Sequence, residues 1–364
     1  MRSSVWQRLL PFLTLIALFV GLIIATPNFF TPTNLSSVVR QTAVINIMAL
    51  GMTMVIITGG IDLSVGSILA LAGCLGTMAM TNGLDLRGIL TVVVVGAGII
   101  RVVNVGPLRS WRMILFWIGG IVLYFLERNK IPAIMLVLPV PLAILVGTLV
   151  GCAAGTMNGI LTTRLRINPF IVTLGTLLII RGGALILTNG MPVQNVPKGF
   201  SFLGEGSVAG VPFVLVILLV IAGIVHVILE HTKLGRYAFA IGSNPDAAFY
   251  AGIPVKFHTT VIYGICGMLT GLAGMIESSR LMTGQPTAGQ GYELPAIAAV
   301  VIGGGSLRGG EGSVVGTLIG AFIMGLLSNG CDLLGIQPFV QQATIGAVII
   351  LAVSVDELRK RKMT

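Results

Sequence analysis

Long apolar runs joined by short, basic connections dominate this 364-residue sequence. Only 9% of its residues are charged and 55% are hydrophobic, whereas a soluble globular chain carries about 25% charged residues. A helix of about 20 apolar residues is long enough to cross the hydrocarbon core of a bilayer. The pattern therefore predicts an all-α polytopic membrane protein. It excludes a disordered chain, a disulfide-rich secreted domain and a water-soluble enzyme.

The apolar runs predict a series of membrane helices with short loops between them. They cover residues 9–25, 42–58, 64–82, 88–102, 113–126, 133–152, 169–187, 211–230, 259–278, 292–307, 314–328 and 338–354. Four of these runs, at 88–102, 113–126, 292–307 and 314–328, are shorter than a full crossing requires. We interpret them as tilted partial spans, re-entrant segments or halves of broken helices. No soluble domain is appended, so residues 1–364 are predicted to form one transmembrane domain.

Lys and Arg residues in the loops indicate the orientation, because they accumulate on the cytoplasmic side of a membrane. With the N-terminus inside and every segment crossing, fifteen of these residues lie inside and six lie outside. The outer six are Arg40, Arg87, Arg128, Lys130, Lys198 and Arg280. Both termini are thus predicted in the cytoplasm. The excess of 22 basic over 12 acidic residues belongs to membrane loops, which argues against a nucleic-acid partner.

No pattern of catalytic, cofactor-binding or metal-binding residues occurs. The cysteines lack CxxC or histidine-partner spacing, so we interpret them as packing residues; they are Cys74, Cys152, Cys266 and Cys331. The glycine-rich stretch Gly303–Ser313 lacks the Gly-Lys-Ser/Thr ending of a phosphate loop. The chain is therefore predicted to be no enzyme, to need no cofactor or metal, and to be unable to hydrolyse ATP by itself.

The stretch Thr58–Ser67 (TGGIDLSVGS) interrupts two apolar runs with glycines and an acid. An acidic residue inside a membrane region is costly and marks a functional candidate, so Asp62 is predicted at a translocation pathway or at a helix break. Asp62 can equally act as a helix cap, and the two roles are compatible. Ser64 is predicted to cap the following helix. A faint repeat at an offset of 246 relates residues 55–67 to residues 301–313, as in transporters with repeated broken helices.

Two further stretches carry polar residues between apolar runs. Asn158-Gly159 is predicted to end the run from 133, with the basic turn Thr162–Arg166 after it, and Pro169 to begin the next helix. Arg181 lies inside an apolar run, where we interpret it as snorkelling to an interface.

The inside loop 231–258 contains Asn244-Pro245-Asp246, a helix start signal, and Gly252 as a stop. It predicts a short amphipathic helix that docks a soluble partner or lies at the interface.

Four ordered motifs resemble the permease subunits of ABC importers for monosaccharides, of the ribose, galactose and xylose type. The motifs are Gly59–Gly66; Pro169–Thr176; Leu234–Tyr237 followed by Gly242–Asn244 and Ala247-Ala248 to Gly252; and Gln285–Gly289 through Gly291–Leu294 to Gly303 and Gly320. The resemblance covers nearly the whole chain except 84–132, which carries two extra apolar segments and is interpreted as an insertion. A core of about ten transmembrane helices is expected beside it.

The resemblance implies a pore-forming subunit in the cytoplasmic membrane that pairs with a second copy or a related permease. It also implies a separate cytoplasmic ABC ATPase and an extracytoplasmic sugar-binding protein. The loop 231–258 would couple to the ATPase through Gly235, Arg236, Asn244, Asp246, Ala247, Ala248 and Gly252. Asp62, Ser64, Asn158, Thr173 and Glu293 are predicted at the translocation pathway or its helix breaks.

Two other functions stay open at this point. A branched-chain amino-acid ABC permease shares the general pattern, and the Gly59–Val65 run argues against it. An ion-coupled secondary transporter would need intramembrane ionisable residues, for which Asp62 and Glu293 are the candidates. A membrane-embedded enzyme lacks a catalytic constellation.

Overall fold

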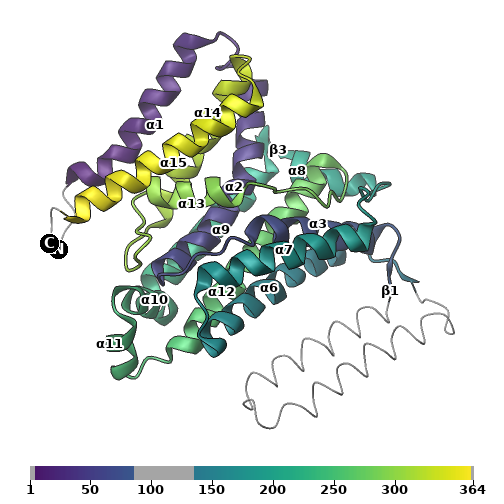
Figure 1. Ribbon diagram of the computed structural model, residues 1–364. Helices are drawn as coiled ribbons and strands as arrows, with labels where there is room; N and C mark the ends of the chain where they lie inside the picture. The colour runs from purple at the N-terminus through teal and green to yellow at the C-terminus, as the bar shows by residue number, and fades with distance from the viewer. Residues whose placement is uncertain (1–4, 86–134, 362–364) are drawn as a thin grey trace, which may run out of the picture.

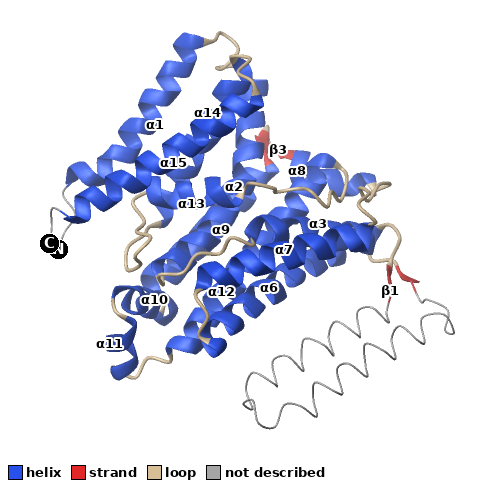
Figure 2. Ribbon diagram, viewed as in Figure 1, coloured by secondary structure: helices blue, strands red, loops and turns tan. Residues whose placement is uncertain are grey.

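The computed structural model describes residues 5–85 and 135–361, which are mostly helical (Figures 1 and 2). The long helices are α1 (Val5–Ala25), α2 (Pro32–Ile57), α3 (Val65–Met80), α6 (Val140–Leu165), α7 (Pro169–Thr188), α9 (Phe213–His231), α12 (Val255–Leu281), α14 (Val314–Leu333) and α15 (Pro338–Arg361). The short ones are η2 (Lys198–Phe200), α8 (Ser201–Glu205), α10 (Lys233–Ser243), α11 (Pro245–Tyr250) and α13 (Glu293–Ile302). The predicted all-α membrane class is confirmed.

Two short antiparallel pairs are the strands of the described residues. One joins β3 (Ser207–Val208) to β4 (Val211–Pro212). The other joins β1 (Leu84–Asp85) to β2 (Met135–Leu136), so the chain leaves and re-enters the bundle at one place. The predicted insertion 84–132, with its segments 88–102 and 113–126, lies outside the described residues apart from its first two.

Six helices of the described residues, α2, α6, α7, α9, α12 and α14, are long and apolar enough to cross a membrane. The prediction that 314–328 falls short of a crossing is wrong, because α14 continues to Leu333 and has 20 residues. In contrast, α13 has 10 residues, about 15 Å of helix. That length is about half the hydrocarbon core, as expected for half of a broken helix.

The predicted bounds of the run 133–152 are wrong at both ends. α6 starts at Val140 and continues to Leu165, so Asn158, Gly159 and most of the predicted basic turn belong to the helix. Asn158 does not end the helix because its side chain finds polar partners in another segment. Gly159 does not end it because α12 packs closely there: a Cβ on Gly159 would lie 2.7 Å from the Cα of Thr260.

Helices α6 and α12 pack backbone against backbone through glycines. A Cβ on Gly151 would lie 2.2 Å from the carbonyl oxygen of Gly267, and one on Gly155 would lie 2.2 Å from that of Tyr263. A Cβ on Gly267 would meet the Gly151 oxygen at the same distance. Small residues four apart let membrane helices approach this closely. Larger side chains would separate the pair.

Helix α2 lies at the centre of the bundle and contacts α9, α12, α13 and α14. Its residues from Thr42 to Ile57 are almost all buried, which explains why the helix is apolar on every side. Two polar ties join it to α14. The hydroxyls of Thr53 and Thr317 are 2.7 Å apart, and the amides of Asn34 and Asn329 exchange hydrogen bonds of 3.1 and 2.9 Å.

The two ends of the bundle carry different short elements. In Figure 1, α10 and α11 lie at one end and α8 and β3 lie at the opposite end. By the distribution of Lys and Arg, the α10 end is predicted to face the cytoplasm. We call these ends the inner end and the outer end.

Candidate functional site

The segment Thr58–Ser64, here called the α2–α3 break, begins with a glycine turn that ends α2. Gly59 adopts a left-handed conformation with φ of +79°. Its amide donates to the Ile56 carbonyl at 2.8 Å, and the Gly60 amide donates to the Val55 carbonyl at 3.1 Å. This arrangement satisfies carbonyls that a helix end would otherwise leave unpaired. It frees the following residues to turn back into the bundle.

The structure brings three of the predicted site residues, Asp62, Ser64 and Asn158, into one hydrogen-bonded group. The Asp62 side chain is fully buried. Its Oδ1 accepts from the Ser64 amide at 3.0 Å and from the Ser64 hydroxyl at 2.6 Å. From α6, Asn158 Nδ2 lies 3.3 and 3.4 Å from the two Asp62 oxygens and 2.7 Å from Ser64 Oγ. We call these three residues the polar junction.

Two hydroxyls attach the same break to other helices through the carbonyl of Ile61. Thr173 of α7, also a predicted site residue, lies 3.2 Å from the Ile61 oxygen. Tyr263 of α12 lies 3.4 Å from it. Sequence reasoning missed Tyr263, although a tyrosine in an apolar helix signals a partner for its hydroxyl. The break is therefore held by three helices, α6, α7 and α12.

Ser64 is the N-cap residue of α3, as predicted, but the expected capping bond is wrong, because its hydroxyl donates to Asp62. Asp62 takes the cap-like role, since it accepts from the amide of Ser64. The junction lies inside the bundle: Asn158 is about 10 Å from the Leu165 end of α6 at 1.5 Å per residue. No cation of the described residues forms an ion pair with Asp62. A buried carboxylate without a cation depends on its neutral donors, so the junction ties α3 to α6.

A second break, between α13 and α14, starts with the same turn. Gly304 has φ of +90°, and its amide donates to Val301 at 2.9 Å while the Gly305 amide donates to Val300 at 2.8 Å. Gly59 and Gly304 are therefore equivalent at an offset of 245, one less than the sequence comparison predicts. The starts of α3 at Val65 and α14 at Val314 differ by 249, so the second break is four residues longer.

Glu293, the fifth predicted site residue, belongs to a separate polar group. It is half-buried at the start of α13, and its Oε2 lies beside α3, where a Cβ on Gly66 would approach it to 2.6 Å. Arg181 of α7 interacts electrostatically with Glu293. Arg181, interpreted from the sequence as snorkelling, uses its Nη1 to donate to the carbonyls of Pro286 and Ala288 at 2.8 Å each. Arg181 thus holds the segment that leads into α13.

At the inner end, the predicted coupling residues lie on two short helices. Asn244 caps α11 by accepting from the Ala247 amide at 2.9 Å, which confirms the helix start, and Gly252 follows with φ of +82°. Five of these residues are exposed, namely Arg236, Asn244, Asp246, Ala247 and Gly252. Gly235 and Ala248 are buried and so support the helices from within.

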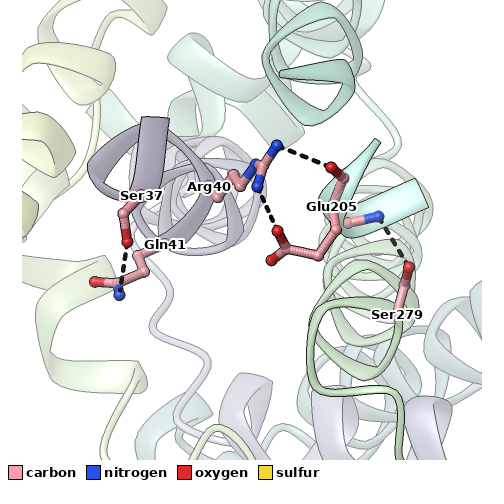
Figure 3. Close-up of polar contacts among 6 residues, drawn as sticks. Ser37, Arg40, Gln41, Glu205 and Ser279 are labelled. Carbon is pink, nitrogen blue, oxygen red and sulfur yellow. Dashed lines mark hydrogen bonds and ion pairs between the residues drawn. The ribbon is translucent and has the colours of Figure 1, made fainter. Parts of the chain in front are cut away.

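Sequence reasoning also missed a polar group at the outer end, drawn in Figure 3. Arg40 of α2 pairs with the Glu205 carboxylate and donates to the Glu205 carbonyl at 2.8 Å. Arg40 was recognised only as an outer positive charge. The signal that could have identified it is its position directly before the long apolar run from residue 42, where an arginine needs a partner.

Comparison with known proteins agrees with this architecture. Residues 34–353 match the family described as the permease component of the branched-chain amino acid transport system. The chain belongs to this permease family. It is 39% identical to the ribose import permease protein RbsC of Escherichia coli (strain K12) over 355 residues, which is 95% of this chain and 94% of the relative. The identity to RbsC of Bacillus subtilis (strain 168) is also 39%, over 97% and 94% of the two chains.

A third relative of the permease is the galactose/methyl galactoside import permease protein MglC of Escherichia coli (strain K12), with 30% identity over 96% of this chain and 93% of the relative. No solved structure shows significant similarity. The permease is thus a multi-pass membrane protein and a transport subunit, which agrees with the prediction that it is not an enzyme.

Proposed function

We propose that this permease forms the translocation pathway of an ATP-driven importer for a monosaccharide. One observation carries the proposal: the chain is 39% identical over 95% of its length to a protein named as a ribose import permease. The family model carries a branched-chain amino acid description, which keeps an amino-acid substrate as the second candidate. Sugar uptake also suits the sparse polar groups inside the bundle, because a solute that must leave again needs weak contacts.

Uptake measurements in cells that lack only this permease test the proposal. We expect uptake of one labelled pentose or hexose, from a panel of D-ribose, D-allose and D-galactose, to fall to background. Leucine uptake should stay unchanged. Loss of leucine uptake with normal sugar uptake would instead support the amino-acid function. Uptake that needs an ion gradient and continues without ATP would contradict both candidates.

We infer that a separate ATPase docks on α10 and α11. The support is an aromatic pair at the inner end: Phe249 and Tyr250 of α11 are 66% and 86% exposed, with ring centroids 5.8 Å apart. Exposed aromatic side chains are typical anchors of protein interfaces. The predicted coupling residues Arg236, Asp246 and Ala247 are also exposed here.

The α10 helix contacts the end of α2 and the α13–α14 break, which supports its role in transmission. A Cβ on Gly242 would lie 1.7 Å from the Ile57 carbonyl oxygen and 2.5 Å from the Gly310 amide nitrogen. The Gly310 amide itself donates to the Ile57 carbonyl at 2.8 Å. A displacement of α10 therefore reaches the end of α2 and the α13–α14 break directly. Such a displacement would bias the protein between two global states, as alternating access requires.

Co-purification from membranes tests the docking surface. With Phe249→Ser and Tyr250→Ser together, we expect the ATPase to be lost while the permease still inserts. Phe30→Ser is the matched control, because Phe30 is 62% exposed but lies in the α1–α2 connection at the outer end. Equal ATPase recovery from the two variants would contradict docking at α11.

We further propose that the permease works as a pair, with a second copy or a related permease, and receives its solute from an extracytoplasmic sugar-binding protein. Apolar faces support contact with lipid or a second permease: Leu178, Ile179 and Ile186 of α7 are each at least 67% exposed. Crosslinking of single cysteines on α7 in native membranes separates these two neighbours, since only a second permease gives a crosslinked dimer.

A further inference from the structure

A polar pocket opens at the outer end of the bundle, away from the polar junction and from the coupling helices. It has a volume of about 440 Å³ and is lined by Pro32, Thr33, Ser36, Ser37, Arg40, Gln41, Glu205 and Arg280. The lining comes from the first three turns of α2, from α8 and from the end of α12. Small-molecule sites commonly have volumes of about 300–1,000 Å³, so one monosaccharide fits.

The walls of this pocket are fixed by bonds between the helices, as Figure 3 shows. Ser279 of α12 accepts from the Gly204 amide at 2.8 Å and donates to the Phe200 carbonyl. A Cβ on Gly204 would lie 2.7 Å from the backbone nitrogen of Arg280, so α8 packs directly on α12. The next residue, Glu205, then meets Arg40 of α2. The site is therefore built before any ligand arrives.

Charges in and around the pocket nearly balance. Arg40 pairs with Glu205, and Arg280 pairs with Glu277 at 3.5 Å. A balanced set disfavours a strongly charged ligand, because attraction and repulsion cancel and nothing compensates the cost of removing its charge from water. It favours a neutral solute that offers both donors and acceptors.

The polar atoms around the pocket suit hydroxyl groups in particular. Thr33, Ser36 and Ser37 supply hydroxyls that both donate and accept, and Gln41 supplies an amide. The residues that line the pocket include no aromatic ring. A sugar ring therefore has no aromatic face to stack on, and it binds weakly.

We propose that this pocket is an outer subsite for a neutral polyhydroxylated solute, used between release from a binding protein and passage through the bundle. The proposal rests on the sugar-import function and on the predicted orientation. It makes Ser37, Gln41 and Arg280 solute-contacting residues. Weak binding here suits a site that the solute must leave in the next step.

Solute protection of an introduced cysteine tests the subsite in the full-length permease. Ser37→Cys is modified from outside with a membrane-impermeant thiol reagent, in membranes without binding protein. The unaltered chain gives the background of the native cysteines. We expect 100 mM D-ribose, D-allose or D-galactose to slow modification at least threefold, whereas glycine betaine at the same osmolarity leaves the rate unchanged. Ser207→Cys in β3 is the matched control, exposed at the same end but outside the pocket, and the sugars should not protect it.

A second variant distinguishes contact from indirect effects. Adding Arg280→Met to Ser37→Cys should raise the sugar concentration for half-protection at least fivefold. No protection by any of the sugars would overturn the subsite, and so would failure of the reagent to reach the introduced thiol in Ser37→Cys. Protection by the binding protein alone would assign the face to docking and also overturn it. Sugar uptake, measured separately, shows whether the proposed function fails with it.

Discussion

Asn158 of α6 donates to both carboxylate oxygens of Asp62, at 3.3 and 3.4 Å, across 96 residues of sequence. The bond links the middle of one long helix to the turn before another. Asn158 is neutral and fully buried, so it stabilises the acid without adding a charge. Its own Oδ1 has no hydrogen-bond partner. The Asp62 carboxylate therefore gains donors from Asn158, while the Asn158 carbonyl oxygen gains no hydrogen bond in return.

Removing this amide should destabilise the permease. For Asn158→Ala we expect a loss of about 1.5–3 kcal/mol, the usual contribution of a hydrogen bond to a charged group. In the double variant with Asp62→Asn, the loss should be smaller than the sum of the two single losses, because the residues share one interaction. Thermal unfolding of all four proteins in detergent measures this cycle. Strict additivity would show that the two side chains act independently.

The glycine contact between α6 and α12 predicts that alanine destabilises the permease there but not at a glycine outside the contact. Gly155→Ala places a Cβ 2.2 Å from the Tyr263 carbonyl oxygen, and such overpacking costs about 1–3 kcal/mol. Gly175→Ala on α7 meets nothing within 4 Å and should be neutral or stabilising, by up to about 1 kcal/mol of helix propensity. Unfolding temperatures of the two variants provide the measurement. A tolerated alanine at 155 would show that the helices separate easily.

The bonds from Arg181 predict local loosening when they are lost. In Arg181→Met, the carbonyls of Pro286 and Ala288 lose their donor, so amide hydrogen exchange over 284–292 should become faster. Arg181→Lys keeps a cationic donor and should restore part of the protection. Exchange over α9, which these bonds do not reach, serves as the internal control. Unchanged exchange in the methionine variant would mean that other contacts hold the segment.

The close approach at Gly242 predicts loss of coupling without loss of docking. Gly242→Ala forces a shift, because its Cβ would lie 1.7 Å from the Ile57 carbonyl oxygen. We expect the ATPase to co-purify at the normal level while sugar uptake falls at least tenfold. Ser243→Ala, at the exposed neighbouring position, should keep both properties. Normal uptake by the alanine variant at 242 would exclude this contact from transmission.

Much of the helix order was predictable because each crossing needs a long apolar run, and such runs are visible without partners. Helix ends were less predictable. α6 passes through Asn158 because an amide inside a helix is tolerated when a distant carboxylate accepts from it. That acceptor comes from the α2–α3 break, and sequence spacing does not reveal which residues face each other.

For the candidate site too, the sequence identified the polar residues but not their partners. Asp62, Ser64, Asn158 and Thr173 were each recognisable as polar residues beside apolar runs, and the structure collects them around one break. Their partners were not recognisable, since pairings such as Arg181 with the Pro286 carbonyl depend on how helices pack. The outer pocket was missed for a related reason. Its residues lie on three separate helices, α2, α8 and α12, which no single motif contains.

The meeting of Gly242, Ile57 and Gly310 has a mechanical consequence. All three touch through backbone atoms, so no side chain lies between them that could rotate and absorb a small movement. Even a small displacement of α10 would therefore displace the end of α2 and the α13–α14 break together. If the proposed ATPase docks on α10, the movement it causes there would therefore be passed to α2 and α14 by direct backbone contact.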